Sequence, residues 1–212
     1  MKSRFRILAL FAVAAAAVFC GYAAAQETLT YPDLVKRLVD LEHLAVLPAE
    51  GETCRQWSSW DRASIYDEAA GKYVRWDANG DGGGIIRKEG SQVVMAEMAG
   101  PGCIWRIWSA RGEKGHVKIF LDGADQPAVD LPFAEYFTGK SAPFTYPTLS
   151  YDLNKHGSSG QNLYFPIPYQ KSCKIVADAG WGLYYHFTYT TFPPGTDVPT
   201  FRTPLADDAD AA

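Results

Sequence analysis

The stretch WGLYYHFTYTT, residues 181–191, alternates apolar and polar side chains more regularly than any other part of the chain. One set is apolar and consists of Leu183, Tyr185, Phe187 and Tyr189. The other set is largely polar and consists of Tyr184, His186, Thr188 and Thr190. Because successive side chains of a strand point to opposite faces, the stretch predicts a β-strand with one buried face. We expect His186 to be a hydrogen-bonded surface residue rather than a catalytic base, since no Ser or Cys nucleophile motif accompanies it.

Shorter segments of the same kind precede this strand. They predict strands at residues 92–98, 103–109, 115–121, 163–167 and 172–177. Glycine and proline separate them, as in GPG at residues 100–102 and DG at residues 122–123. In the third segment Val117, Ile119 and Leu121 are expected to point inward. Many short strands with little helix indicate an all-β sandwich, of which the jelly roll is the natural member.

One amphipathic helix is expected before the strands. Thr30 is a suitable N-cap, with Pro32 in the first turn. Apolar residues then recur at helical spacing, namely Leu34, Val35, Leu38, Leu41 and Leu44. Pro48 ends the pattern. The helix is expected to pack on the outside of a sheet or, as the alternative, to form an arm that reaches a neighbouring chain.

The first residues have the features of a secretory signal peptide. Lys2, Arg4 and Arg6 precede an apolar run at residues 7–19, which is too short to span a bilayer comfortably. The alanines at residues 23–25 fit a cleavage site. We therefore expect residues 1–25 to be removed and the protein to be extracytoplasmic, periplasmic or secreted, without stable membrane insertion. A lipid anchor on Cys20 is not expected, because the bulky Phe19 precedes it.

Charge and cysteine content limit the possible partners. The formal net charge of the chain is -4, and residues 1–25 hold three basic and no acidic residues, so cleavage would leave -7. An acidic chain without a basic stripe argues against a nucleic-acid partner. The three cysteines beyond residue 25 allow at most one disulfide, and their spacing fits no metal site. Neither a metal nor a cofactor is expected.

The segment SSWDRASIYDEAAGKYVRWDANGDGGG, residues 58–84, has a composition that suits a sugar ligand. Aromatic rings stack on the apolar C–H patches of sugars, while carboxylate, amide and guanidinium groups each hold pairs of hydroxyls. The run NGDGGG at residues 79–84 allows positive φ and a close backbone approach to a ligand. The alternative is an ordinary surface loop. The candidate substrate-binding residues here are Trp60, Asp61, Arg62, Asn79 and Asp81.

Arg106 is the sixth candidate. Alternation over residues 103–109 places it on one strand face with Ile104 and Trp108. A guanidinium between apolar neighbours needs a counter-charge, because burying it alone costs several kcal/mol. We therefore expect Arg106 to pair with Asp61 or Asp81. The alternative is a position at a sheet edge with the guanidinium in solvent.

Five blocks of sequence carry a resemblance to a known family. They are SSWDR (58–62), NGD (79–81), AGPGCIWRIW (99–108), LYFPIPYQKSCKI (163–175) and YYHFTYTTFPPGTDVPTF (184–201). In these blocks the chain resembles the DUF2961 family, which is grouped with glycoside hydrolase family 172. That family acts on furanosides such as α-D-fructofuranosyl and D-arabinofuranosyl units. The resemblance therefore implies a glycoside hydrolase whose substrate is an oligosaccharide or glycan.

The resemblance also implies what lies outside this chain. Family members resemble a tandem of two jelly rolls assembled as trimers or hexamers, and this chain covers the first roll. Their catalytic glutamate pair is expected beyond Phe201, in a retaining mechanism that needs two carboxyls. No family motif gives a catalytic role to the glutamates nearest the motifs, which are Glu68, Glu89, Glu97 and Glu135. The catalytic residues are therefore unknown, and the chain alone is expected to be inactive.

The predicted organisation has four parts. A signal peptide (1–25) and a helical segment (26–52) precede the jelly roll (53–202), and the start of a truncated helix or a linker follows (203–212). A free-standing carbohydrate-binding module is the alternative function, because a single jelly roll has the right size and needs no carboxylate pair. A purely structural jelly roll would bind no ligand.

Overall fold

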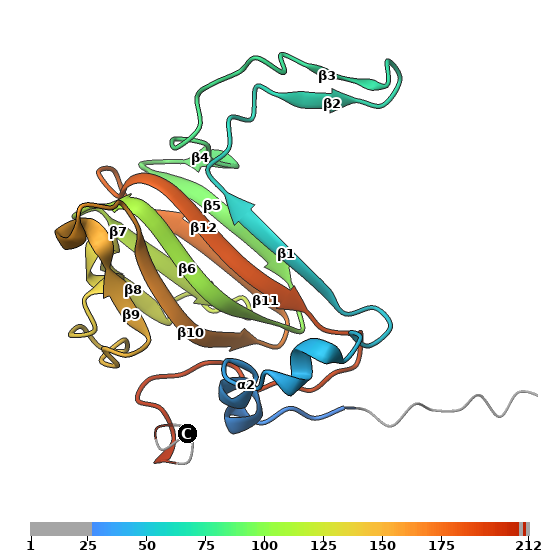
Figure 1. The fold of residues 1–212 in the computed structure, drawn as a ribbon, viewed down its shortest axis with the longest axis vertical. Helices are drawn as coiled ribbons and strands as arrows, with labels where there is room; N and C mark the ends of the chain where they lie inside the picture. The colour runs from blue at the N-terminus through green and yellow to red at the C-terminus, as the bar shows by residue number, and fades with distance from the viewer. Residues whose placement is uncertain (1–26, 208–209, 211–212) are drawn as a thin grey trace, which may run out of the picture.

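The computed structural model describes residues 27–207 and residue 210 of the 212-residue chain. Two five-stranded antiparallel sheets lie face to face, and a two-stranded hairpin projects away from them (Figure 1). With one short N-terminal helix, this architecture confirms the predicted all-β sandwich. The predicted signal peptide lies outside the described residues.

Sixteen elements make up the described fold, and each sheet combines strands that are distant in sequence. The front sheet has the spatial order β1 (Thr53–Ser58), β12 (Gly182–Thr191), β6 (Gly102–Gly112), β10 (Gln161–Tyr169) and β9 (Ser150–Asp152). The back sheet has the order β4 (Arg87–Glu89), β5 (Gln92–Ala99), β11 (Ser172–Ala177), β7 (His116–Leu121) and β8 (Val129–Pro132). The hairpin consists of β2 (Ile65–Asp67) and β3 (Lys72–Val74). The helical elements are α2 (Tyr31–Arg37) and the 3-10 turns η1 (Glu42–Ala45), η2 (Phe133–Phe137) and η3 (Leu153–His156).

The inner faces of the two sheets share one apolar core. The front sheet contributes Ile107, Leu163, Tyr185, Phe187 and Tyr189, and the back sheet contributes Met95, Val117, Ile119, Leu121 and Ile175. The aromatic rings of η2 pack into the same core, with the Phe133 and Phe137 centroids 5.2 Å apart. Burial of each large aliphatic or aromatic side chain contributes roughly 1.5–3 kcal/mol. The inward faces predicted for the strands at residues 115–121 and 181–191 are correct at these positions.

A bulge in β6 changes the predicted pattern of that strand. Adjacent residues of β12 pair with Arg106 and Ile104, which leaves Trp105 between them without a partner on β12. The extra residue shifts the alternation, so that Ile104 and Ile107 both point into the core. The prediction that Ile104 shares a face with Arg106 is therefore wrong. Sequence alternation alone cannot count a residue that the neighbouring strand skips.

The helix α2 begins where the sequence predicts. The Thr30 side chain accepts a hydrogen bond from the backbone N–H of Asp33, whose carboxylate in turn accepts one from the backbone N–H of Thr30. This reciprocal pair is a capping box. Leu34 is fully buried and packs with Cys103 on the outer side of the front sheet. The helix therefore lies on the outside of the sandwich, as one of the two predicted arrangements requires.

The helix is shorter than predicted. It ends at Arg37, and the Asp40 carboxylate accepts hydrogen bonds from the backbone N–H groups of Glu42 and His43, which starts a separate turn. The apolar residues that the longer helix would have buried, Leu41 and Leu44, are 78% and 80% exposed. A short polar side chain that competes for backbone donors thus overrides the helical periodicity.

The three described cysteines form no disulfide. Cys103 and Cys173 are buried and Cys54 is exposed, and all three thiols are free. Within residues 27–207, no helix is long and apolar enough to cross a membrane. At the other end of the chain, the backbone N–H of Asp210 donates to the carbonyl of Ala206, as in a helical turn. Residues 203–206 are not helical, so the predicted helix does not begin at Thr203; residues 208, 209, 211 and 212 lie outside the described part of the chain.

Asp122 joins three segments at one end of the sandwich. Its carboxylate accepts hydrogen bonds from the backbone N–H groups of Gln170, Lys171 and Ser172 and from the hydroxyl of Thr200. Its φ of 56° belongs to the turn that follows β7. Burial raises the pKa of the Asp122 carboxyl, but these four donors favour the ionised form more strongly and leave the pKa below its usual value.

We predict that Asp122→Ala lowers the free energy of unfolding by about 1.5–3 kcal/mol, because hydrogen bonds to a charged group are lost. Asp122→Asn is the matched control, since asparagine also tolerates positive φ but carries no charge. The stabilisation from the ionised carboxylate is present above the ordinary pKa of 3.8 and is lost as pH falls through the lower folded-state value. In urea unfolding, the gap between wild type and Asp122→Asn should shrink from about pH 7 to about pH 3. A gap that does not change with pH would contradict this role.

Candidate functional site

The segment from Ser59 to Gly84 leaves the end of β1 and is bound at its base to β12. The backbone N–H of Ser59 donates to the carbonyl of Tyr185, and the Ser59 hydroxyl accepts from the Tyr185 N–H. The N–H groups of Gly82 and Gly84 both donate to the Ser59 carbonyl, at 2.9 and 3.2 Å. The N–H of Tyr184 closes the arrangement on the carbonyl of Gly82. The segment is therefore anchored firmly at its base while the β2–β3 hairpin projects beyond it (Figure 1).

The two aspartates predicted to contact substrate hold this base together. Asp61 accepts hydrogen bonds from the backbone N–H groups of Ala63 and Gly80, both at 2.9 Å. Those two bonds lower the pKa of the Asp61 carboxyl. Asp81 accepts from the backbone N–H of Asp61 at 2.6 Å. Both carboxylates therefore have a structural use within the segment, and the exposed Asn79 lies beside them in sequence.

The glycine run serves packing within the protein. Gly82 has a φ of 104°, and a Cβ there would lie 2.8 Å from the ring of Tyr184. A Cβ on Gly84 would lie 1.9 Å from the carbonyl oxygen of Trp60. The predicted positive φ and close approach are thus present at Gly82, but the partner is the Tyr184 ring. Tyr184 itself has a φ of 60°, which is unusual for an aromatic residue and marks a constrained backbone.

Arg62 and Trp60 contact each other near the start of the segment. The Arg62 guanidinium donates to the carbonyl oxygens of Trp60 and Ser58, and its carbon lies 4.8 Å from the centroid of the Trp60 ring. Trp60 remains 45% exposed, so one part of the indole is open to a ligand. Arg62 also acts on the core residue Tyr185: burial raises the pKa of Tyr185 to about 12, and the charge and hydrogen bonding of Arg62 oppose this rise.

Arg106 lies on the outer face of the front sheet, away from those carboxylates. Its Nη2 and Nε donate to Oδ1 of Asn162, at 2.9 and 3.3 Å. Its guanidinium carbon is 5.7 Å from the centroid of the Tyr164 ring. Trp108 stacks against His186 on the same face, with centroids 4.6 Å apart. Among the described residues, no carboxylate pairs with Arg106, so the predicted partnership with Asp61 or Asp81 is wrong.

The sequence pattern missed most of this outer face. Asn162, Tyr164 and His186 are brought beside Arg106 and Trp108 by strand register, since Arg106 pairs with Tyr164 and Trp108 pairs with both Asn162 and His186. The signal available in the sequence was that polar residues occupy alternate positions in each of three strands. Using it requires knowing that β6 lies between β10 and β12, which no single strand reveals.

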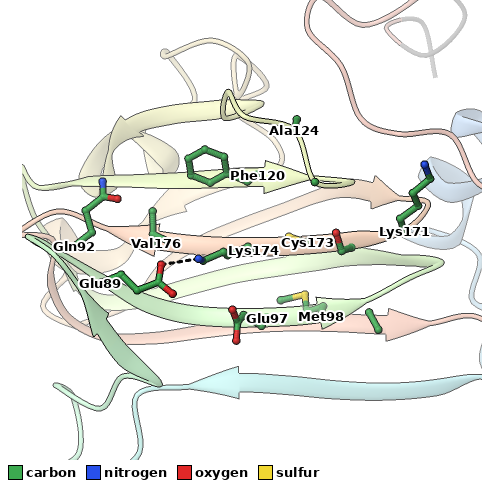
Figure 2. A pocket seen from close by; sticks show the side chains of 13 residues that line it. Glu89, Gln92, Glu97, Met98, Phe120, Ala124, Lys171, Cys173, Lys174 and Val176 are labelled. Atoms are coloured by element: carbon green, nitrogen blue, oxygen red, sulfur yellow. Dashed lines mark hydrogen bonds and ion pairs between the residues drawn. The ribbon is translucent and has the colours of Figure 1, made fainter.

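The outer face of the back sheet holds a shallow depression of about 670 Å³ (Figure 2). Glu89, Glu97 and Lys174 line it from three neighbouring strands. Lys174 donates to Glu89 at 2.6 Å, and Nη2 of Arg87 lies 2.6 Å from a carboxylate oxygen of each glutamate. Phe120 adds an aromatic ring to the lining. The depression is therefore walled by an ion-pair network whose charges are already compensated.

Comparison with known protein families matches residues 50–209 to the GH172 first beta-sandwich domain. The chain belongs to glycoside hydrolase family 172. The match covers the front and back sheets together, and it supports the resemblance seen in the five sequence blocks. A comparison with curated proteins returned no match.

Glycoside hydrolysis commonly uses a protonated carboxyl as general acid, and the back-sheet glutamates do not fit that role. The hydrogen bond from Arg87 lowers the pKa of Glu97, while Lys174 and Arg87 lower that of Glu89. Both groups are thus held ionised, and Arg87 lies between them. Glu135 lies on η2, where it accepts a hydrogen bond from Ser141. Glu135 therefore belongs to a different contact from the ion-pair network of Glu89 and Glu97. Among the described residues, no group of three or more His, Cys, Asp or Glu side chains could hold a metal ion.

We predict that Arg106→Ala costs about 1–2 kcal/mol of unfolding free energy, the loss expected for a hydrogen bond to an amide and a cation–π contact. A buried ion pair would cost about 3–5 kcal/mol when broken. The double mutant with Asp61→Asn separates the two cases in urea unfolding. Because Arg106 and Asp61 are not partners, the two effects should add to within about 0.5 kcal/mol. A large deviation from additivity in the double mutant would instead indicate that Arg106 and Asp61 do form an ion pair.

A second prediction concerns the base of the segment. Gly84→Ala should lower stability by about 1–3 kcal/mol, because the new methyl group meets a backbone oxygen and cannot be accommodated without a shift. Gly83→Ala is the control, since a Cβ there has no atom within 4 Å. Thermal unfolding followed by tryptophan fluorescence measures both. Equal stability of the two variants would show that the Trp60 carbonyl does not constrain this turn.

Proposed function

We propose that this chain is the first domain of an extracytoplasmic GH172 enzyme that hydrolyses furanosides, with α-D-fructofuranosyl or D-arabinofuranosyl units as substrates. The single observation that carries the proposal is the family match over residues 50–209. The five sequence blocks support the furanoside class through the resemblance stated above. The N-terminal pattern of residues 1–25 supports export.

The domain contributes substrate contacts rather than the catalytic pair. Trp60 offers a partly exposed aromatic face that Arg62 holds in place, and Arg106 offers a guanidinium on the outer sheet face. Asp61 and Asp81 shape the segment through backbone hydrogen bonds and bring Asn79 to the surface. The paired glutamates that cleave the bond belong to sequence beyond Phe201.

The complete enzyme is proposed to assemble as a trimer or hexamer. The projecting β2–β3 hairpin supports such an assembly, because a two-stranded hairpin has no core of its own and gains stability when covered. Its apolar side chains, and those that follow it, are largely exposed: Ile65, Tyr66, Tyr73, Val74 and Trp76, the last at 80%. An exposed apolar group of this kind is typical of a protein interface.

A non-catalytic carbohydrate-binding module is the second candidate function. The observation that favours it is the outer face of the front sheet, where Arg106, Trp108 and His186 are held without an acid and nucleophile pair. Binding would then be complete within this chain. Hydrolysis, by contrast, requires the second sandwich.

The fourth prediction separates the two functions. The purified chain should show no turnover of aryl α-D-arabinofuranoside or aryl α-D-fructofuranoside, because we propose that the carboxyl pair belongs to sequence beyond Phe201. A longer form that includes the second sandwich should hydrolyse one of them. The measurement is release of the aryl group from both proteins at equal concentration. Turnover by the short chain that disappears in Glu97→Gln or Glu135→Gln would place catalysis within these residues. An inactive longer form would remove the furanosidase proposal.

A further inference from the structure

The outer face of the front sheet holds a positive charge that the protein does not neutralise. Arg106 is half-buried, and among the described residues its side chain donates only to the neutral amide of Asn162. Its other contact is the neutral ring of Tyr164, which attracts a cation only weakly. Asn162 occupies the Nε/Nη2 edge of the guanidinium, while Nη1 has no hydrogen-bond partner among the described residues. The Nη1/Nη2 edge can therefore form a charge-assisted, bidentate hydrogen bond.

The described strand neighbours that share the outward face with Arg106 carry no acidic side chain. Two rows of outward residues cross the sheet at this point, and we call them the Arg106 face. One row consists of Gln56, Thr188, Arg106 and Tyr164, and the other of Ser58, His186, Trp108, Asn162 and Tyr151. None of these nine residues is Asp or Glu. An anion placed here would meet one cation and several neutral donors, with no carboxylate in either row to repel it.

The Arg106 face also carries aromatic rings, at a distance from Arg106 that one sugar residue can bridge. Trp108 is two residues from Arg106 on β6, a separation of about 7 Å along a strand. The Trp108 ring is held against His186, whose pKa is lowered by burial and by the charge of Arg106, so that the imidazole is neutral near pH 7. Tyr151 and Tyr164 form a stacked pair at the other side, with centroids 6.3 Å apart and rings inclined by 21°. These two tyrosines are 42% and 36% exposed.

We propose that the Arg106 face binds a saccharide that carries a carboxylate, a uronic acid residue, with the carboxylate on Arg106 and the sugar ring against Trp108. The inference deepens the glycan-contact role proposed for Arg106 and rests on that part of the proposed function. It does not depend on hydrolysis, and it names a ligand class other than the neutral furanosides. Asn162 orients the guanidinium through Oδ1 and is itself almost fully buried, at 5% exposure.

The test is a binding titration of the purified protein with three probes: sodium D-galacturonate, neutral D-galactose and sodium acetate. Binding is followed through the indole N–H resonances of the tryptophans. We expect galacturonate to bind at least about tenfold more tightly than either control, a difference of about 1.4 kcal/mol. Because the attraction is ionic, added salt should weaken binding of galacturonate. Hydrolysis of furanosides is measured separately, so failure here leaves the proposed catalytic function untouched.

Three variants locate the binding charge. Arg106→Gln should weaken galacturonate binding about tenfold or more. Arg111→Gln is the matched control, because Arg111 is also on β6 but is exposed and paired with Glu113, and it should bind as the wild type does. Asn162→Asp places a carboxylate beside Arg106 and should abolish the preference for the anionic sugar. This last variant keeps the Arg106 side chain, so it tests the charge even if Arg106→Gln folds poorly.

Several results would overturn the inference. Equal affinity for galactose would show that the face reads neutral hydroxyls, and equal affinity for acetate would show that it reads a carboxylate without a sugar. Unchanged galacturonate binding in both Arg106→Gln and Asn162→Asp would place the site elsewhere. If galacturonate shows no saturable binding, the proposed uronic acid ligand is wrong.

Discussion

The pairing of β6 with β12 on one side and β10 on the other is the constraint on which the functional surface depends. It joins residues near position 106 to residues near positions 164 and 188, which no local interaction could bring together. The bulge at Trp105 then decides which side chains face outward. Without the extra residue, either Ile104 or Arg106 would be on the wrong side of the sheet. The core and the Arg106 face are therefore set by one irregularity in one strand.

Much of the fold could be predicted from the sequence because its signals are local. The alternation at residues 181–191, the GPG and DG turns and the Thr30 capping box each depend on neighbours within a few positions. The end of α2 could not be predicted in this way. The Asp40 carboxylate accepts hydrogen bonds from backbone N–H groups that a longer helix would have used. The helix therefore ends although the helical spacing of apolar residues continues. Leu41 and Leu44 lie at helical spacing from the residues of α2, but the helix does not extend to them.

The sequence predicted which residue types the candidate site contains, but it did not predict which atoms they contact. Trp60, Asp61, Arg62, Asn79 and Asp81 do belong to one compact segment, as their sequence proximity indicates. The role of the aspartates could not be read from sequence, because it depends on backbone N–H groups about twenty residues away that an aspartate in a turn can reach. The expected counter-charge for Arg106 was a sound electrostatic requirement, but an amide and an aromatic ring meet it only in part. GH172 membership is shown by the family match over residues 50–209, which does not depend on the geometry of either group of residues.

The distribution of the described thiols decides which of them solvent can reach. Burial raises the pKa of Cys103 and of Cys173, so both remain protonated and are shielded from oxidants. Cys54 is exposed on β1, and β1 is an edge strand of the front sheet. An oxidant would therefore meet Cys54 first among the described thiols, at the edge of the front sheet and outside the core. The two other described thiols are buried, so the exposed thiol is separated from the packed interior of the sandwich.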